Sequence, residues 1–299
     1  MSRGRDALGF DQATAERWLA YVRATLWPYF RPQVIGGDHL PRGRALIVGC
    51  HSGVVPYDAA CTLVAIHEAT GRFARAVGDR LFARVRVVEQ FLRRHGAVVG
   101  RFDVIEELLR RGHLVLLFPG GARDMERSYL TQRYRVLPHR GFAPGRGGYI
   151  RIALRTGAPI VPLAVVGAEE AHVLLANVAP LARMLSAPFF PLLLFPFPLP
   201  VKLYVRFGEP FRLPGTAADA DDGRRVDQLN AMVRRRVQGL IDDTVERRNG
   251  IIFSSYRDGR PSGGALHTDG HPPSRRARQA RARVHPVAGG SASLRRAAP

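Results

Sequence analysis

A-L-I-V-G-C-H-S-G-V-V-P-Y-D, residues 45–58, is the stretch that decides the fold and the site of this chain. Residues 45–48 are apolar and predict a buried strand. His51 follows in a small polar turn, and Asp58 comes where a helix is expected to begin. A carboxylate can accept a hydrogen bond from one imidazole nitrogen, which leaves the other to take a proton from a hydroxyl or thiol. The pair is therefore a candidate base with its orienting group; a histidine that only fills or caps the core is the alternative.

The pattern around this stretch predicts an α/β fold, in which a mostly parallel sheet is flanked by helices. The continuous apolar run at 114–118 is typical of a strand buried in a parallel sheet. Further strands are predicted at 33–36, 73–77, 96–99, 160–166 and 201–207. Apolar residues at helical spacing predict helices at 11–30, 59–69, 80–94, 104–111, 149–156 and 226–248.

The chain is expected to have three parts. Residues 1–32 hold an N-terminal amphipathic helix, whose tryptophans and arginines suit either a membrane interface or packing on the core. Residues 33–253 form the main domain. Residues 254–299 are rich in Gly, Pro, Ser, Ala and Arg, and are expected to be a disordered basic tail because they can bury little apolar surface.

The net charge of the chain indicates which classes of partner to expect. The 299 residues include 45 Lys+Arg against 25 Asp+Glu, a formal net charge of +20. This excess predicts an anionic partner: nucleic acid, a membrane surface or a phosphorylated small molecule. The arginines are scattered and no zinc finger, RNP motif or K-homology loop is found, so nucleic acid is not expected. Cys50 and Cys61 lie in apolar surroundings without metal-ligand spacing, so we expect neither a disulfide nor a metal site.

The most apolar run, residues 187–200, contains five prolines, which exclude a regular spanning helix. We expect an apolar loop that dips into a bilayer surface; packing in a hydrophobic groove is the alternative. The first residues, M-S-R-G-R-D, are mostly polar, so we expect no signal peptide, and no segment reaches the roughly 18 to 20 apolar residues of a membrane span. We therefore expect a cytoplasmic protein held peripherally on the inner face of the membrane.

F-P-G-G-A-R, residues 118–123, follows the buried strand at 114–118. Two glycines leave backbone N–H groups unhindered at the carboxyl edge of the sheet, and Arg123 adds a guanidinium that can hold a phosphate or carboxylate. A turn that only reverses the chain is the alternative. The place of this turn after a buried strand, together with His51, favours a functional site.

Four blocks resemble the glycerolipid acyltransferases of the lysophosphatidate and glycerol-3-phosphate type, and most closely the branch with the monoacylglycerol and diacylglycerol acyltransferases. H-S-G-V-V-P-Y-D at 51–58 is similar to the family's His/Asp motif, and F-P-G-G-A-R at 118–123 to its F-P-E-G-T-R block. A-P-I-V-P-L-A-V-V-G-A-E-E at 158–170 is similar to its apolar strand with a proline, and residues 96–101 match a further block loosely. The resemblance covers residues 34–211.

Two positions depart from the family's pattern. Six residues, 52–57, separate His51 from Asp58, whereas most of the family has four, and Pro56 stands where the Asp is usually found. The branch with F-P-G-G tolerates the longer spacing, so Asp58 is our assignment. Gly120 replaces the Glu of the phosphate-using members, which makes a neutral mono- or diacylglycerol an alternative acceptor to lysophosphatidate.

The resemblance implies an O-acyltransferase. His51, oriented by Asp58, would deprotonate an acceptor hydroxyl, which would attack an acyl thioester directly. The donor would be acyl-CoA or acyl carrier protein as co-substrate, with no bound cofactor and no metal. The acceptor would be a glycerolipid or lysophospholipid, and an anionic membrane surface would be a partner.

The resemblance also implies a substrate-binding set. It consists of Phe118, Pro119, Gly120, Gly121, Arg123 and Arg101. The amides of the two glycines are candidate donors to the oxyanion, and the two arginines would hold a phosphate of the acceptor or of the thioester carrier. The alternatives are a lipid-ester hydrolase, for which no G-x-S-x-G elbow is found, and a catalytically silent lipid-binding relative.

Overall fold

The computed structural model describes residues 5–53, 55–78, 86–99, 101–126, 133–184, 190–252 and 255–256, all of them within the unit Met1–Gly259. Residues 80–85 of the predicted helix at 80–94 lie outside the described residues. So do residues 187–189 of the apolar run and all of the predicted tail except residues 255 and 256.

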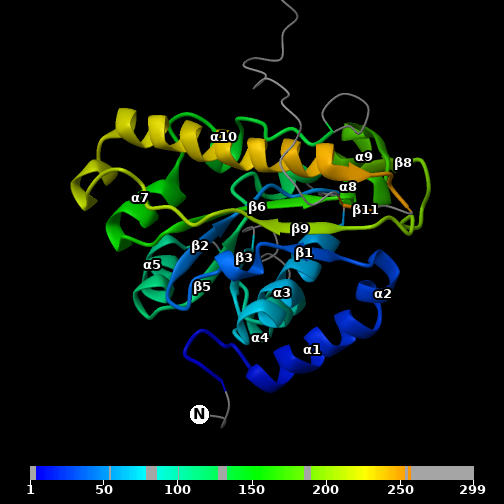
Figure 1. The fold of residues 1–299 in the computed structure, drawn as a ribbon, viewed down its shortest axis with the longest axis horizontal. Helices are drawn as coiled ribbons and strands as arrows, with labels where there is room; N and C mark the ends of the chain where they lie inside the picture. Colours follow the sequence, from blue (N-terminus) through cyan, green and yellow to red (C-terminus); the bar gives the residue numbers. More distant parts are fainter. Residues whose placement is uncertain are drawn as a thin grey trace, which may run out of the picture. The chain divides into compact units, whose positions relative to one another are not determined.

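A seven-stranded sheet lies at the centre of the described part of the chain, in the order β1-β9-β6-β2-β5-β3-β4 (Figure 1). Neighbouring strands pair in parallel, except that β6 and β9 are antiparallel. The mostly parallel sheet that the sequence predicts is therefore confirmed. Its strands are β1 Gln33–Ile35, β2 Ala45–Val48, β3 Arg75–Gly78, β4 Val98–Val99, β5 Leu114–Leu117, β6 Ile160–Val166 and β9 Tyr204–Phe207.

Helices cover both faces of this sheet. In Figure 1, α10 lies along one side of the sheet, and α3 lies on the other with α1 beyond it. The α-helices are α1 Gln12–Ala24, α2 Leu26–Phe30, α3 Tyr57–Thr70, α4 Arg86–Arg94, α5 Phe102–Arg110, α7 Gly148–Thr156, α8 Ala168–Ala171, α9 Ala179–Met184 and α10 Gly223–Arg247. Short 3-10 helices are η1 Gly37–His39, η3 Gly121–Glu126, η4 Arg140–Phe142 and η5 Ala217–Ala220.

The central strand β2 contributes to two separate cores. Alternate residues of a strand point to opposite faces of its sheet. Leu46 and Val48 pack in the core formed with α5, α7 and α10, whereas Ala45 and Ile47 pack in the core formed with α3. All four side chains are fully buried, which explains why this segment reads as a continuous apolar run.

The predicted helix at 11–30 is two helices, which break at Thr25. Pro28 has no N–H to donate to the carbonyl four residues earlier, so α1 cannot continue regularly through this point. Leu19 and Val22 pack against Val64 of α3. This face of α1 therefore packs on the core, as one of the two interpretations expected.

Three segments differ from the sequence prediction. Within the apolar run, β8 Pro191–Leu193 pairs antiparallel with β7 Leu174–Asn177, so part of the expected loop is a strand. The strand expected at 201–207 begins only at Tyr204, although Val201 and Leu203 are fully buried. In addition, β11 Ser255–Tyr256 pairs with β10 Arg248–Asn249, inside the region expected to be tail.

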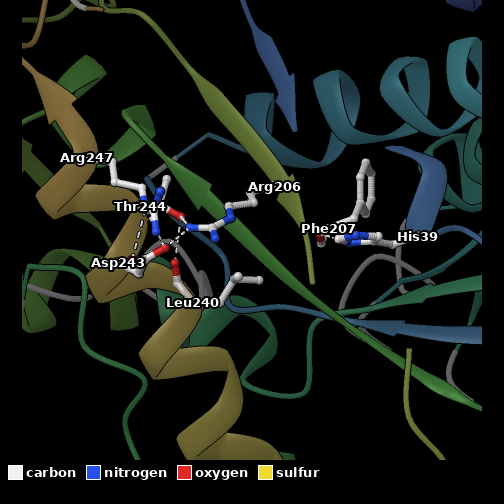
Figure 2. Close-up of polar contacts among 7 residues, drawn as sticks. All are labelled: His39, Arg206, Phe207, Leu240, Asp243, Thr244 and Arg247. Carbon is white, nitrogen blue, oxygen red and sulfur yellow. Dashed lines mark hydrogen bonds and ion pairs between the residues drawn. The ribbon is translucent and has the colours of Figure 1, made fainter. Parts of the chain in front are cut away.

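Polar contacts fix α10 to strand β9 (Figure 2). Arg206 of β9 donates to Asp243, and Arg247 donates to both oxygens of the same carboxylate at 2.9 and 3.0 Å. At the end of β9, a ring nitrogen of His39 lies 2.9 Å from the carbonyl oxygen of Phe207. None of the helices in the described part of the chain has both the length and the apolar character that a membrane crossing needs.

Candidate active site

His51 and Asp58 form a hydrogen-bonded pair, called the dyad below. Nδ1 of His51 lies 2.9 Å from Oδ2 of Asp58. Because a carboxylate only accepts, Nδ1 carries the proton and Nε2 is left in the acceptor form. Asp58 is 1% exposed, and it also accepts from the backbone N–H groups of Ser52 at 2.8 Å and Ala59 at 2.7 Å. These contacts hold the carboxylate, and through it the imidazole, in one orientation.

The loop between the two dyad residues explains how the longer spacing is accommodated. Gly53 has φ +103°, and a Cβ there would lie 2.6 Å from the carbonyl oxygen of Ala168 at the start of α8. Only glycine fits both the left-handed conformation and this close approach. Pro56 is the N-cap of α3, so Asp58 enters the first turn of that helix, where a negative charge is favoured. The structure thus brings His51 and Asp58 into contact, and their catalytic role stays a prediction.

The segment Phe118–Gly121, called the glycine turn below, lies against the dyad. Val48 of β2 and Leu117 of β5 are paired in register, so the residues that follow both strands emerge at the same edge of the sheet. The rings of His51 and Phe118 are stacked, with centroids 3.9 Å apart and planes at 20°. The amide of Gly121 donates to the carbonyl of Phe118 at 3.0 Å, which closes the turn.

Arg123 and Arg101, the two arginines predicted to bind phosphate, lie in different parts of the structure. Arg123 is exposed on η3, two residues after the end of the glycine turn. Arg101 precedes α5, and its side chain, 70% exposed, donates to Asp103 at 2.6 Å. Strand β3 lies between β5 and the strand β4 that leads to Arg101. The structure therefore brings the dyad and the glycine turn into contact, whereas Arg101 pairs with Asp103 in the first turn of α5.

Sequence reasoning missed a second carboxylate–histidine pair beside the dyad. Asp124 is 1% exposed; its Oδ2 accepts from the backbone N–H of His51 at 3.2 Å, and its Oδ1 lies 2.8 Å from Nε2 of His139. Asp124 comes directly after F-P-G-G-A-R, so its place in the sequence was a usable signal. The sequence contains no such signal for His139, because no predicted strand or motif precedes this residue.

Cys50 and Cys61 are both buried. Burial, reinforced by the nearby charge of Asp58, raises the pKa of the Cys61 thiol to about 12. A thiol with such a pKa is a poor nucleophile at neutral pH. Among the described residues, no group of three or more His, Cys, Asp or Glu side chains is arranged to hold a metal ion.

Comparison with known proteins places this geometry in context. The family model described as Acyltransferase matches residues 31–166, which include the dyad and the glycine turn. An uncharacterized protein of Mycobacterium leprae is 34% identical over 262 residues, covering 83% of this chain and 70% of that protein. A mouse protein named DGAT1/2-independent enzyme synthesizing storage lipids is 27% identical over 241 residues, covering 79% of this chain and 68% of that protein.

Coverage is lower for a further relative. A Mycobacterium tuberculosis protein is 34% identical over 237 residues, and the chain spans 64% of its length. Among solved structures, the 1-acyl-sn-glycerophosphate (LPA) acyltransferase of Thermotoga maritima is similar at a TM-score of 0.49 and 18% identity. That match covers 76% of this chain and 79% of the Thermotoga chain.

Proposed function

The chain belongs to the glycerolipid acyltransferase family, and from this premise we propose that it moves a fatty acyl group from an acyl thioester to a hydroxyl of a glycerolipid or lysophospholipid. One observation carries the proposal: the imidazole of His51 is oriented by Asp58 at 2.9 Å and stacked on Phe118 of the glycine turn. Residues 33–253 would carry this reaction.

The dyad supports direct transfer. In the proposed reaction Nε2 of His51 takes the proton of the acceptor hydroxyl, and the oxygen attacks the thioester carbonyl. The C–S bond breaks as the ester forms, and the leaving thiolate takes the proton back from the imidazolium. Asp58 stabilises that imidazolium and keeps Nδ1 protonated throughout. The acyl thioester is a co-substrate, and the proposed steps use no bound cofactor.

The tetrahedral intermediate needs hydrogen-bond donors to its oxyanion. The glycine turn was expected to offer two amides. That of Gly121 already donates within the turn, to Phe118 at 3.0 Å. We therefore assign the oxyanion role to the amide of Gly120. Arg123, exposed beside it, is the proposed contact for a phosphate of the thioester carrier, acyl-CoA or acyl carrier protein, with Arg101 as a second contact.

A neutral acceptor is the preferred substrate class. Gly120 lacks the carboxylate that the phosphate-using members carry at this position, and the mouse relative is named for synthesis of storage lipids. Monoacylglycerol and diacylglycerol are therefore proposed ahead of lysophosphatidate. The named relative lends this choice support only through family likeness, so the acceptors must be compared directly.

The proposed enzyme works at an anionic membrane surface, on the inner face. The apolar segment, residues 190–200, exposes four large side chains: Leu192 49%, Leu194 51%, Phe195 49% and Phe197 78%. Arg31 donates to the carbonyls of Pro200 at 2.6 Å and Ile252 at 2.9 Å, so the base of this loop is anchored. Exposed apolar side chains on a chain of net charge +20 suit a lipid surface with anionic headgroups.

Thiol release from long-chain acyl-CoA tests the proposal. Purified protein is offered monoacylglycerol, diacylglycerol and lysophosphatidate in parallel, beside His51→Ala and the control His67→Ala at the far end of α3. Release that needs an acceptor, produces the acylated lipid and vanishes only in His51→Ala supports transfer. Acceptor-independent release would instead indicate a hydrolase. If the protein releases thiol from neither acyl-CoA nor acyl carrier protein, a catalytically silent lipid-binding relative is the better interpretation.

A further inference from the structure

Three segments that are distant in the sequence meet at the carboxylate of Asp124. Its Oδ2 accepts from the backbone N–H of His51, 3.2 Å away at the end of β2. Its Oδ1 lies 2.8 Å from Nε2 of His139, which must donate because the carboxylate only accepts. Asp124 itself belongs to η3, which begins within the glycine turn. One buried carboxylate therefore links the backbone of the base to two loops.

The glycine turn is shaped to admit this carboxylate. A Cβ on Gly120 would lie 2.0 Å from Oδ1, 2.2 Å from Cγ and 2.3 Å from Oδ2 of Asp124. Carbon and oxygen atoms that are not bonded do not approach so closely. Any side chain at position 120, including the Glu of the phosphate-using members, would thus displace the Asp124 carboxylate from His51.

The loop that carries His139 is fixed to the same turn. The amide of Gly141 donates to the carbonyl of Pro119 at 2.8 Å. A Cβ on Gly141 would lie 2.8 Å from the Cβ of Pro119, so this approach also needs a glycine. His139 is therefore held against Asp124 by its own loop, independently of the hydrogen bond between the two side chains.

We propose that Asp124, held in place by His139, is a positioning residue that fixes the backbone of His51 against the glycine turn, and that Gly120 is glycine because it must admit this carboxylate. The proposal rests on the proposed function, because it assigns Asp124 to the same reaction. It also gives Gly120 a steric meaning, which adds to its meaning for acceptor choice. A base displaced by even 1 Å costs an enzyme about 100-fold in rate.

The kinetic test uses the full chain with acyl-CoA and the preferred acceptor. Asp124→Ala should lower kcat by about 100-fold with a much smaller change in KM, since the base moves and the binding surfaces stay. Asp124→Asn keeps an oxygen for the His51 amide and should retain more activity. His139→Gln keeps an N–H donor and should outperform His139→Leu. Wild-type kcat in both Asp124 variants, or an equal loss in the two His139 variants, would overturn the proposal.

The steric test is a double-mutant cycle that also works without activity. Gly120→Ala should lower both kcat and the melting temperature of the otherwise unchanged chain, and should add no further loss to Asp124→Ala, because the clashing atoms are then gone. Gly43→Ala, where a Cβ meets nothing within 4 Å, is the matched control. Additive losses in both readouts would overturn the assignment of Gly120.

If the wild-type protein transfers no acyl group, the proposed function fails, whereas the melting temperatures still report on the contact between positions 120 and 124.

Discussion

Oδ2 of Asp58 lies 2.9 Å from Nδ1 of His51, although six residues, 52–57, separate them in the sequence. The same oxygen accepts a hydrogen bond from the backbone amide of Ser52 at 2.8 Å, so the carboxylate also contacts the start of the connecting loop. The extra length is taken up before α3 begins at Tyr57. The position of Asp58 in the first turn of α3 therefore brings its carboxylate to His51.

Asp58→Asn should lower kcat by about 100- to 10,000-fold, the range expected for loss of general-base function. The amide would not stabilise the imidazolium, and it would favour the tautomer with the proton on the wrong nitrogen. Steady-state kinetics with acyl-CoA and the preferred acceptor provide the measurement. KM for the thioester should change little, because Asp58 is 1% exposed and has no access to substrate. Activity within a few-fold of the wild type would remove Asp58 from the mechanism.

Gly53→Ala should destabilise the protein by more than about 1 kcal/mol, since alanine at positive φ is strained. Here φ is +103° and the new Cβ would lie 2.6 Å from the carbonyl oxygen of Ala168. Urea unfolding measures the loss, with Gly43→Ala as the control. Because Gly53 lies between the dyad residues, kcat should fall in the same variant. Equal unfolding midpoints for the two variants would contradict this account of the loop.

Much of the central fold follows from local pattern. The runs 45–48, 114–117 and 160–166 are apolar throughout because each strand is covered on both faces, and the structure places them side by side as β5-β2-β6. The parallel arrangement brings the carboxyl ends of neighbouring strands to one edge of the sheet. The proximity of His51 to the glycine turn can therefore be predicted as well. These features are local enough to be seen in a single sequence.

What could not be predicted depends on contacts between distant segments. His139 reaches Asp124 from a loop 15 residues further on, and neither residue shows a periodicity that would pair them. The antiparallel pairing of β7 with β8 was missed because prolines obscure a strand pattern, and Pro191 is tolerated at the first position of β8. The break between α1 and α2 was visible in principle, since Pro28 interrupts the helical hydrogen bonds.

His172 should make the stability of the protein depend on pH. It is 5% exposed and stacks on Tyr57, with ring centroids 5.8 Å apart. Burial lowers the pKa of His172, partly offset by a hydrogen bond with the backbone of Pro196. Below the usual pKa of 6.5 the unfolded state therefore binds the proton more readily than the folded state. Stability from neutral His172 is present above that pH and is lost as the pH falls through the lowered pKa.

The comparison of wild type with His172→Phe isolates this contribution, because the other histidines are present in both proteins. Free energies of unfolding are measured in urea at several pH values from neutral to moderately acidic. On acidification the wild type should lose more stability than the variant, so that the difference between them shifts in favour of the variant. Two parallel curves would mean that His172 titrates alike in the folded and unfolded states.

The apolar segment, residues 190–200, provides the last prediction. Phe195 and Phe197 are 49% and 78% exposed in the described structure, and a bilayer surface would bury them. Burying one phenylalanine side chain contributes about 1.5 to 3 kcal/mol, so Phe195→Ser with Phe197→Ser should weaken binding to anionic liposomes by at least tenfold. Phe102→Ser, which removes a ring 58% exposed on α5, is the control and should bind as the wild type does. Flotation at low and high salt separates the electrostatic contribution to binding from the burial of the rings. Salt screens the attraction of the +20 chain to anionic headgroups, whereas ring burial remains. If the double variant floats as well as the wild type at both salt concentrations, the membrane contact lies elsewhere on the chain.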